Sequence, residues 1–382
     1  MDVNALSGPM PPQTTAEASA TPPTSCEIGI VGGGIIGLAA AWRLARAGRQ
    51  VVVFDPTPGL GASRVAGGML GATAETGFAE ASQAQHHQAS RQAWDPFLAD
   101  LSADLGRAID YEAIGTIAVG LDGSDIRAIQ QLATFQASLG LDVEQLDRDA
   151  LDALCPGLGR TVARGWFLRD DGAIDNRAIV ADLLDACRMR GVEFVATQVN
   201  EISDLREGTR ELTTPNGSCA ANLVIVATGA ARLPILPQDG QYPRIPQVHP
   251  VGGTIVRLSG SGSVPHLKYT IRSLVHGRPC YLVPRRDGSV VLGATAVERG
   301  YDLHVDAGGL FQLLEDGRRI FPALDDYAIE EIATGLRPTT DSHVPFVEGV
   351  GPGLLAALGH YRNGFLLAPG TALRILELVE AP

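Results

Sequence analysis

Cysteine is scarce in this chain and shows no pairing motif. The five cysteines are scattered, are odd in number and include no C-x-x-C spacing. This usage argues against a disulfide framework and indicates a reducing compartment, so a cytoplasmic location is expected. Residues 1–25 also lack the basic start and apolar core of an export signal. Their content of Pro, Thr, Ser and Ala predicts a disordered tail.

Positive charge is scarce relative to negative charge. The 30 Lys and Arg residues are outnumbered by 43 Asp and Glu residues, which gives a formal net charge of -13. Such a balance works against binding to nucleic acid or to an anionic membrane, so a small-molecule ligand is expected. The uncharged stretch 28–42 is rich in glycine and shorter than the ~18 to 20 apolar residues that span a membrane.

Two common kinds of catalytic centre are also absent. His86 and His87 are adjacent, but no Cys or carboxylate lies at ligand spacing, so the pair is interpreted as a solvated helix face and no metal site is expected. Ser63 does not sit in a G-x-S-x-G elbow, and no hydrolase triad is visible.

One segment does carry a strong pattern, that of a dinucleotide-binding unit. Residues 28–31 are typical of a buried parallel strand, residues 35–47 of a helix and residues 50–54 of a second strand. The turn and the end of the second strand are marked by Gly32, Gly34, Gly37 and Asp55. Because strand, turn, helix, strand and acid occur in register, the pattern predicts a bound dinucleotide.

Each of these residues has a separate expected role. Gly32 turns the chain, Gly34 lets backbone N–H groups approach a pyrophosphate, and Gly37 lets the helix pack on the strand. The pyrophosphate is expected at the helix N-terminus, where unpaired N–H groups favour an anion. Asp55 is placed to accept hydrogen bonds from ribose hydroxyls.

The remaining patterns alternate between strand and helix, which predicts an α/β fold whose nucleotide-binding part is in pieces. Strands are expected at residues 193–199, 223–226 and 355–358, and a polar, glycine-bounded loop at residues 359–364. Four further segments alternate in a way that predicts a largely antiparallel sheet in a second domain: 115–120, 253–258, 280–283 and 289–293.

Several stretches together resemble the glycine oxidases of the D-amino-acid oxidase superfamily. The match covers nearly everything from Cys26 to about Leu378. Besides the fingerprint, its landmarks are Ala66–Ala72, Ala227–Gly229, Cys280–Arg285, Val291–Thr295, Gly335–Pro338 and Gly359–Gly364. The order and spacing of these landmarks make the resemblance specific.

The resemblance implies an α/β fold with a discontinuous Rossmann-type FAD-binding domain and a substrate domain with a mostly antiparallel sheet. The FAD-binding domain is expected at 26–108, 171–238 and 332–382, and the substrate-binding domain at 109–170 and 239–331. FAD is expected to be noncovalent, since no His or Cys is clearly placed for attachment. The expected FAD contacts are Gly32, Gly34, Ile35, Ile36, Gly37, Asp55, Pro56, Ser63, Gly67, Gly68, Met69, Val199, Gly229, His360, Tyr361, Arg362, Asn363, Gly364, Phe365 and Leu366.

The resemblance also implies oxidation of an amine next to a carboxylate, with hydride transfer to the flavin, imine hydrolysis and reoxidation by molecular oxygen. Arg337 is then the carboxylate clamp, because its fork binds a carboxylate bidentately. Tyr281 sends its hydroxyl to the same carboxylate, and Arg362 lies in the loop over the flavin. The alternatives are an ion-paired arginine at 337, a core-capping tyrosine at 281 and a surface arginine at 362.

Two departures from the glycine oxidase pattern bear on the substrate. Pro279 replaces a frequent His, and Ala296 replaces a frequent Met, in a pocket that Met69 also lines. The smaller and less polar wall favours an N-substituted glycine, such as the N-carboxymethyl amino acids that related enzymes of macrolactam antibiotic pathways cleave to glyoxylate and a β-amino acid. Neutral drift is the alternative interpretation of both changes.

Three other functions stay open at this stage. They are ordinary glycine oxidation in thiamine biosynthesis, a flavin dehydrogenase with another electron acceptor, and removal of a carboxymethyl group from a tRNA base. The acidic balance of the chain argues against the last. No oligomeric state is predicted.

Overall fold

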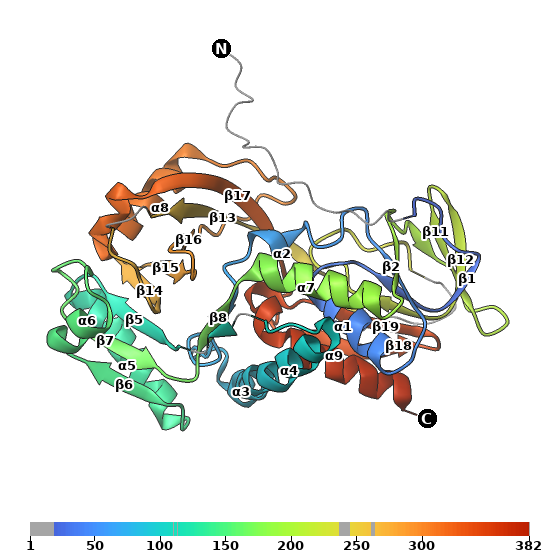
Figure 1. The fold of residues 1–382 in the computed structure, drawn as a ribbon, viewed down its shortest axis with the longest axis horizontal. Coiled ribbons are helices and arrows are strands. Elements are labelled where there is room, and N and C mark those ends of the chain that lie inside the picture. The colour runs from blue at the N-terminus through green and yellow to red at the C-terminus, as the bar shows by residue number, and fades with distance from the viewer. Residues whose placement is uncertain (1–18, 110, 113, 237–244, 261–263, 382) are drawn as a thin grey trace, which may run out of the picture.

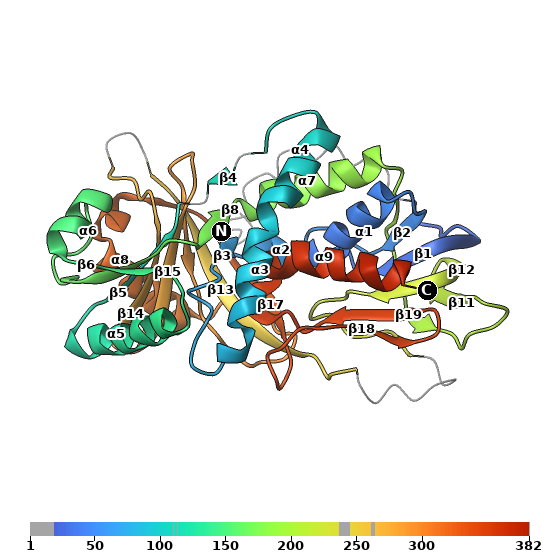
Figure 2. The same ribbon diagram turned by 90° about the horizontal axis from the view of Figure 1, so that it is seen from below.

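The computed structural model describes residues 19–109, 111–112, 114–236, 245–260 and 264–381. It has two halves side by side, each built around an eight-stranded sheet (Figures 1 and 2). The chain passes between the halves several times, because strands of both sheets alternate along the sequence. The predicted α/β class with a discontinuous nucleotide-binding part is therefore confirmed.

The first sheet contains the predicted nucleotide-binding strands. Its central strand β1 (Ser25–Val31) is parallel to β2 (Val51–Phe54) on one side and to β12 (Gly217–Val226) on the other. The other strands are β9 (Glu193–Val195), β10 (Glu201–Ile202), β11 (Arg210–Thr214), β18 (Phe346–Gly351) and β19 (Leu354–Leu358). All four residues of β2 and the last four of β1 are buried, which explains their continuous apolar sequences.

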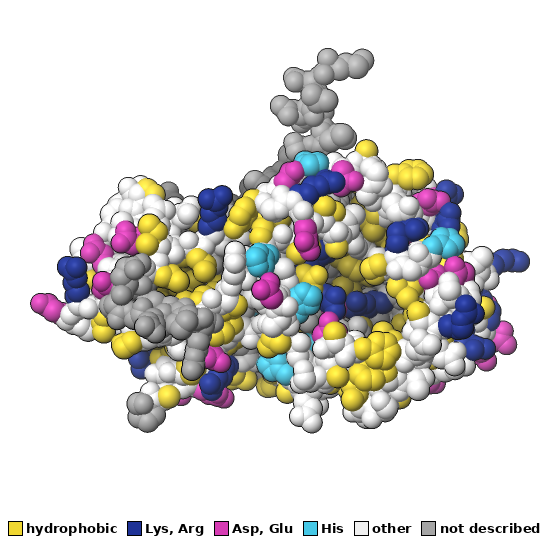
Figure 3. Space-filling view, turned by 180° about the vertical axis from the view of Figure 1, so that it is seen from behind, with side chains coloured by type: hydrophobic (Ala, Val, Ile, Leu, Met, Phe, Trp, Pro, Cys, Tyr) yellow, Lys and Arg dark blue, Asp and Glu magenta, His cyan; other side chains and the backbone are white. Residues whose placement is uncertain are grey.

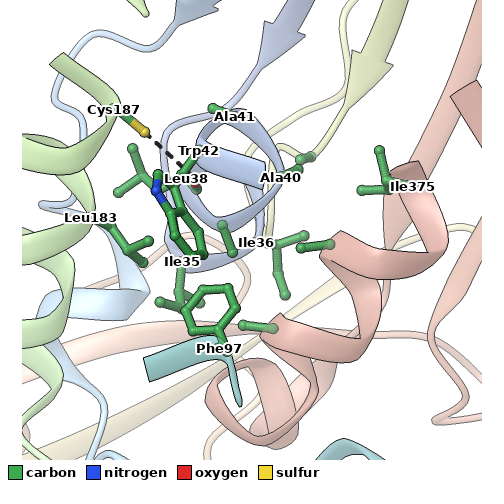
Figure 4. Close-up of a cluster of buried hydrophobic side chains, with 14 of the residues drawn as sticks. Ile35, Ile36, Leu38, Ala40, Ala41, Trp42, Phe97, Leu183, Cys187 and Ile375 are labelled. Atoms are coloured by element: carbon green, nitrogen blue, oxygen red, sulfur yellow. Dashed lines mark hydrogen bonds between the residues drawn. The ribbon is translucent and has the colours of Figure 1, made fainter. Parts of the chain in front are cut away.

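Helix α1 (Ile35–Arg46) lies at the centre of this half and packs against α7 (Asn176–Met189) and α9 (Gly364–Glu380). Figure 4 shows its side chains beside Leu183 and Cys187 of α7 and Ile375 of α9. The rings of Trp42 and Phe97 meet edge to face, 4.8 Å apart, an arrangement worth about 0.5–1.5 kcal/mol beyond its buried area. The predicted helix is thus buried over most of its surface, and only Arg43 and Arg46 lie on a partly exposed side.

The second sheet belongs to the substrate half and has the order β17-β13-β16-β15-β14-β5-β7-β6. All neighbouring strands are antiparallel except β5 and β14, so the predicted mostly antiparallel sheet is confirmed. The strands are β5 (Thr116–Gly120), β6 (Val143–Leu146), β7 (Gly165–Leu168), β13 (His249–Ser259), β14 (Thr270–Val275), β15 (Arg278–Pro284), β16 (Val290–Gly293) and β17 (Ala328–Thr339). Strand β17 pairs with β13 along its whole length, so residues 332–339 lie in this sheet.

Smaller elements cover the sheets and connect the halves. A three-stranded sheet is formed by β3 (Met69–Leu70), β8 (Gly172–Ile174) and β4 (Tyr111–Glu112). The remaining helices are α2 (Ala62–Val65), η1 (Ala81–Gln83), α3 (Ala84–Gln92), α4 (Trp94–Leu105), α5 (Gly123–Ser138), α6 (Arg148–Leu154), α8 (Ala307–Ile320), η2 (Pro322–Asp326) and η3 (Tyr361–Asn363). Helices α5, α6 and α8 are each capped by an aspartate side chain at the N-terminus, the arrangement that stabilises a helix start.

The prediction of a disordered tail over residues 1–25 is wrong for its last part. Residues 1–18 lie outside the described residues. Ser19 forms a bridge to Val195, and its carbonyl accepts a 2.9 Å hydrogen bond from Ala196. The carbonyl of Thr24 accepts from Ala220 at 3.0 Å. Backbone pairing with strands far along the chain orders residues that look unstructured by composition.

The interpretation of both histidines as a solvated helix face is wrong for His87. The side chain of His87 is fully buried, whereas that of His86 is exposed. Among the described residues, Asp122, Asp125 and His276 lie close enough together to suit a cation. The two carboxylates already have partners, however. Asp122 caps α5, and Asp125 accepts hydrogen bonds from the amides of His276 and Gly277. No helix in the described ranges is both long enough and apolar enough to cross a membrane.

Candidate active site

The glycines of the fingerprint sit where β1 turns into α1, and two of them are required by close approach of backbone. Gly32 has φ +112, and a Cβ there would lie within 3.0 Å of the Ala227 carbonyl. A Cβ at Gly37 would lie equally close to the Gly32 carbonyl. At Gly34 the nearest atom would be Ser63 Oγ, at 3.4 Å. The turn is therefore tight on the protein side and open beside Gly34.

The N-cap residue of α1 is Gly34, which has no side chain that could cap the helix. Ser63 Oγ accepts from the Ile35 amide at 2.9 Å, and Asp55 accepts from the Gly33 amide at 2.6 Å. A second bond, from the Thr57 amide, fixes the Asp55 carboxylate at the end of β2. An anion such as a pyrophosphate is favoured at such a helix end.

The space around this turn fits a large polar cofactor. Thr228 Oγ1 and Asn363 Oδ1 are buried and have no hydrogen-bond partner among the described residues. A Cβ at Gly229 would meet nothing within 4 Å, and one at Gly364 would meet only Ile35 Cγ2, at 3.8 Å. Buried polar atoms in native proteins are normally hydrogen-bonded, so Thr228 Oγ1 and Asn363 Oδ1 are suited to bind a ligand. The residues present therefore fit FAD.

The other expected FAD contacts fall into two groups. Gly67, Gly68 and Met69 lead into β3, facing the substrate sheet, and Pro56 is exposed directly after Asp55. The side chains of Ile36, Phe365 and Leu366 are buried in the core between the helices, and that of Val199 in the core beside Phe54 and Val226. For the buried group only backbone atoms could face a cofactor.

The loop from residue 359 to 364 is anchored on several sides. His360 is buried against Thr371 Oγ1 at 3.0 Å, and burial lowers the pKa of His360 to about 3, so the ring is neutral. Tyr361 has φ 47 and stacks on His343, with ring centroids 4.9 Å apart. Asn363 Nδ2 lies 3.5 Å from a ring nitrogen of the buried His87.

Tyr281 lies on the face of the substrate sheet that is turned toward the nucleotide-binding half. A Cβ at Gly293 would fall within 3.0 Å of its ring, and one at Gly67 would lie 3.2 Å away. These two glycines therefore make room for the ring from the sheet and from the opposite half. Burial raises the pKa of Tyr281, while Arg337 and Arg272 oppose that shift, so the hydroxyl stays protonated at neutral pH.

Arg337 projects from β17 across the neighbouring strand. A Cβ at Gly253 would fall within 3.0 Å of its guanidinium, and its Nη1 donates to the Thr295 carbonyl at 3.1 Å. Thr295 is held in turn by the Thr254 amide, which donates to its hydroxyl at 2.9 Å. Arg337 has no acidic partner in the described part of the chain, so the alternative of an ion-paired arginine finds no support there.

Sequence reasoning missed a cluster of charges beside this face. The buried Glu75 forms ion pairs with Arg272 of β14 and with Arg362 of η3. Burial alone would raise the pKa of Glu75, but the two arginines outweigh it and lower the pKa to about 2. Nearby, burial raises the pKa of Asp171 to about 7, although the amides of Thr73 and Ala74 donate to its carboxylate. No local sequence signal links these segments.

The three residues expected to line the substrate pocket lie in different environments. Met69 packs in one apolar cluster with Tyr281 and Val283. Pro279 is exposed two residues before Tyr281 on β15, and strand alternation puts both on one face. Ala296 is exposed next to Thr295, the residue that holds Arg337. On the back of the molecule, Lys or Arg side chains lie inside a hollow between the halves (Figure 3).

Comparison with known proteins identifies the family of the chain. The family described as FAD dependent oxidoreductase matches residues 27–378. The chain is 31% identical to a glycine oxidase from Geobacillus kaustophilus over 93% of each chain. The crystal structure of glycine oxidase from that organism superposes with a TM-score of 0.82 and 29% identity, covering 94% of this chain and 95% of that one.

A bifunctional protein ThiO/ThiG of Synechocystis is 34% identical over 93% of this chain. The chain spans about half the length of that relative, 52%. The comparisons show that the chain belongs to the FAD dependent oxidoreductase family.

Proposed function

We propose that the enzyme oxidises an N-substituted glycine and releases glyoxylate, the free amine and hydrogen peroxide. The observation that carries the proposal is the state of Arg337, a half-buried guanidinium held by a backbone carbonyl beside Tyr281 with no acid among the described residues to neutralise it. A buried charge without a partner is costly, so the site is built for an anion supplied from outside.

The side chains would act by binding and orienting the substrate. Arg337 binds the carboxylate with its planar fork, while the Thr295 carbonyl keeps that fork in place. Tyr281 donates its protonated hydroxyl to the same carboxylate, because its raised pKa keeps the proton on the ring oxygen. With the carboxylate fixed at two points, the adjacent carbon is held in one position, and such positioning lowers the barrier.

Bound FAD supplies the two-electron oxidation of that carbon, with molecular oxygen as the final acceptor. Water then hydrolyses the resulting imine of the substrate. The overall reaction balances as R–NH–CH2–COO⁻ + O2 + H2O → R–NH2 + OHC–COO⁻ + H2O2. The carbon–hydrogen bond breaks without a separate base, so the site needs no free His, Asp or Glu. Glu75, a described carboxylate whose charge acts on Tyr281, is already ion-paired.

The preference for a substituted amine rests on Pro279 and Ala296, two small residues exposed at the edge of the site. An apolar substituent that covers them would gain up to ~0.8 kcal/mol per buried methylene. Glycine cannot use this surface. The curated relatives named glycine oxidase support the coarser activity, and ordinary glycine oxidation is the second candidate.

The test is an amine series of glycine, sarcosine, N-ethylglycine and N-propylglycine, with glyoxylate and peroxide measured in parallel. Catalytic efficiency is expected to rise along the series. A preference for free glycine would return the enzyme to ordinary glycine oxidation. Glyoxylate without peroxide would make it a dehydrogenase with another electron acceptor.

We also propose that the residues around the α1 turn hold FAD noncovalently. The support is the open side of Gly34, the lack of a described hydrogen-bond partner for Thr228 Oγ1, and the glycine at the N-cap of α1, which brings no capping side chain. Gly34→Val puts a branched side chain into the expected pyrophosphate position, so the purified variant should lose most of its FAD absorbance. Acid precipitation should leave the wild-type flavin in solution. Full FAD retention in Gly34→Val would remove the basis of this assignment.

A further inference from the structure

The segment from Ser63 to Gly67 connects the two ends of the expected active site. At one end, Ser63 Oγ accepts a hydrogen bond from the Ile35 amide at the start of α1. At the other end, a Cβ at Gly67 would lie 3.2 Å from the ring of Tyr281. The position of this segment therefore relates the nucleotide turn to the substrate sheet.

Asn176, the first residue of α7, is the centre of the contacts that hold this segment. Its side chain is fully buried. Its Nδ2 donates to the Ser63 carbonyl at 2.8 Å and to the Arg64 carbonyl at 2.9 Å. Its Oδ1 accepts from Arg257 Nη2 at 3.0 Å and from Arg285 Nη2 at 3.3 Å. Carbonyls only accept and guanidinium groups only donate, so one orientation of the amide satisfies all these contacts.

The two arginines come from the substrate sheet and reach the same segment. Arg257 lies on β13, and Arg285 directly follows β15. Arg257 Nη2 also donates to the Arg64 carbonyl at 3.2 Å, and Arg285 Nη2 donates to the Gly67 carbonyl at 2.8 Å. The side chains of Arg257 and Arg285 are 11% and 7% exposed. Burial lowers the pKa of Arg257 to about 10, which still leaves it charged at neutral pH. Hydrogen bonds from charged donors are about twice as strong as neutral ones, so these contacts tie the substrate sheet firmly to the segment.

We propose that Asn176 is a positioning residue, which holds residues 63–67 between the halves and so fixes how the flavin lies relative to Tyr281. Asn176 belongs to the nucleotide-binding half, the two arginines belong to the substrate half, and the segment between them carries expected FAD contacts at both ends. The amide joins the three parts because it both donates and accepts. The effect on catalysis rests on the proposed function, in which Arg337 and Tyr281 hold the substrate carboxylate.

Two substitutions separate the donors of Asn176 from its acceptor. Asn176→Asp keeps the shape and the acceptor for the arginines, but its ionised carboxylate has no donor for the carbonyls of residues 63 and 64. A carboxylate in the first turn of α7 also suits the helix dipole, which guards against misfolding. Asn176→Ala removes all the contacts of the amide. FAD content and circular dichroism check that both variants are folded and loaded.

The control variant is Arg210→Met. Arg210 is likewise fully buried and donates to backbone carbonyls, those of Ser203 and Pro352. It lies opposite Ala221, which pairs with Cys26 near the start of β1, whereas the nucleotide turn follows the end of that strand. Arg210→Met should lower the melting temperature and leave the flavin spectrum and kinetics as in the wild type.

The measurements follow the flavin as well as turnover. In both FAD-loaded Asn176 variants the visible absorption bands of the flavin should differ from those of the wild type, because its contacts with residues 63–67 have moved. Anaerobic stopped-flow reduction by saturating sarcosine should be slower by roughly tenfold to a hundredfold, as expected when the reacting carbon is misplaced. The dissociation constant of (methylthio)acetate, a carboxylate that cannot be oxidised as an amine, should stay within about threefold, since Arg337 and Tyr281 are retained.

A purely structural role for Asn176 gives a different result. Wild-type flavin bands and reduction rates in both folded variants, with only a lower melting temperature, overturn the proposal, and so do equal changes in Arg210→Met. The proposed function fails separately. If glycine reduces the wild-type flavin and sarcosine does not, the preference for N-substituted glycines is wrong, and the Asn176 variants are compared with glycine. If no amine of the series reduces it, the proposed function falls, and the absorption bands decide whether Asn176 positions the flavin.

Discussion

The surroundings of Arg337 and Arg362 differ, although the sequence predicted a role in the active site for both arginines. Arg337 is held by a backbone carbonyl over a glycine, with no acid near it among the described residues. Arg362 is held by Glu75, with Glu80 at 3.6 Å from its Nη2. The first charge is available to a ligand, whereas the second is already compensated within the fold. The role of an arginine in a predicted site therefore depends on the residues that pair with it as much as on its sequence motif.

The largest expected effect is a loss of folding stability in Glu75→Gln, which removes the negative charge that pairs with Arg362. The pKa of Glu75 lies below its ordinary value of 4.5, at about 2, so its stabilisation is present above pH 4.5 and is lost as the pH falls toward 2. The shift corresponds to about 3 kcal/mol at neutral pH. Urea denaturation at pH 7 and pH 4 should show a stability loss at pH 7 that narrows on acidification. The control Glu80→Gln should lose less free energy of unfolding. If the stability of Glu75→Gln changed with pH in parallel with that of the wild type, the proposed charge cluster would be contradicted.

The next largest effect is on catalysis and concerns Arg337, the arginine whose charge is available to a ligand. Arg337→Lys keeps the charge but loses the fork, so kcat/KM should fall on the order of a hundredfold or more. Steady-state kinetics with any accepted amine measures it. The matched variant Arg362→Lys should lose less in kcat/KM, because its principal partners are Glu75 and Glu80. An equal or larger loss at residue 362 would reverse the comparison.

A smaller effect is expected from the glycine beneath Arg337. The methyl group in Gly253→Ala would fall within 3.0 Å of the guanidinium and displace it, so KM should rise roughly tenfold while FAD retention stays normal. Gly349→Ala, a strand glycine whose Cβ would meet only Leu355 at 3.5 Å, is the control. Wild-type KM in Gly253→Ala would show that Arg337 acts from another position.

The smallest effect concerns the rim of the pocket. Ala296→Met should occupy the space proposed for the N-substituent, which lowers turnover of N-propylglycine by up to about fourfold per displaced methylene and spares glycine. Efficiencies across the amine series measure this trend. If the variant handles long and short amines as the wild type does, Ala296 is not part of the pocket wall.

Local sequence patterns predicted the elements around the nucleotide turn because their signals lie within a few residues. The spacing of Gly32, Gly34 and Gly37 encodes strand, turn and helix directly. Contacts between residues far apart along the chain could not be predicted from local patterns. Glu75 and Arg272 are 197 residues apart, and only the register of β14 against β15 places that arginine beside Tyr281.

The errors have the same origin. The pairing of Ser19 with Val195 and the burial of His87 under the loop at Asn363 depend on segments that composition and local spacing do not describe. The burial of α1 everywhere except at Arg43 and Arg46 likewise follows from the helices packed around it, which a single helical pattern does not reveal. The roles of individual FAD contacts stay predictions.

The discontinuous first sheet sets an order of events during synthesis. Strand β1 emerges early from the ribosome, but its neighbour β12 is paired on its second half by β19, which begins only at Leu354. Helix α9, which packs on α1, follows at Gly364. The nascent chain therefore carries an unfinished cofactor cradle from the synthesis of β1 until that of α9. Flavin capture must be a late event, after the substrate sheet has already been made.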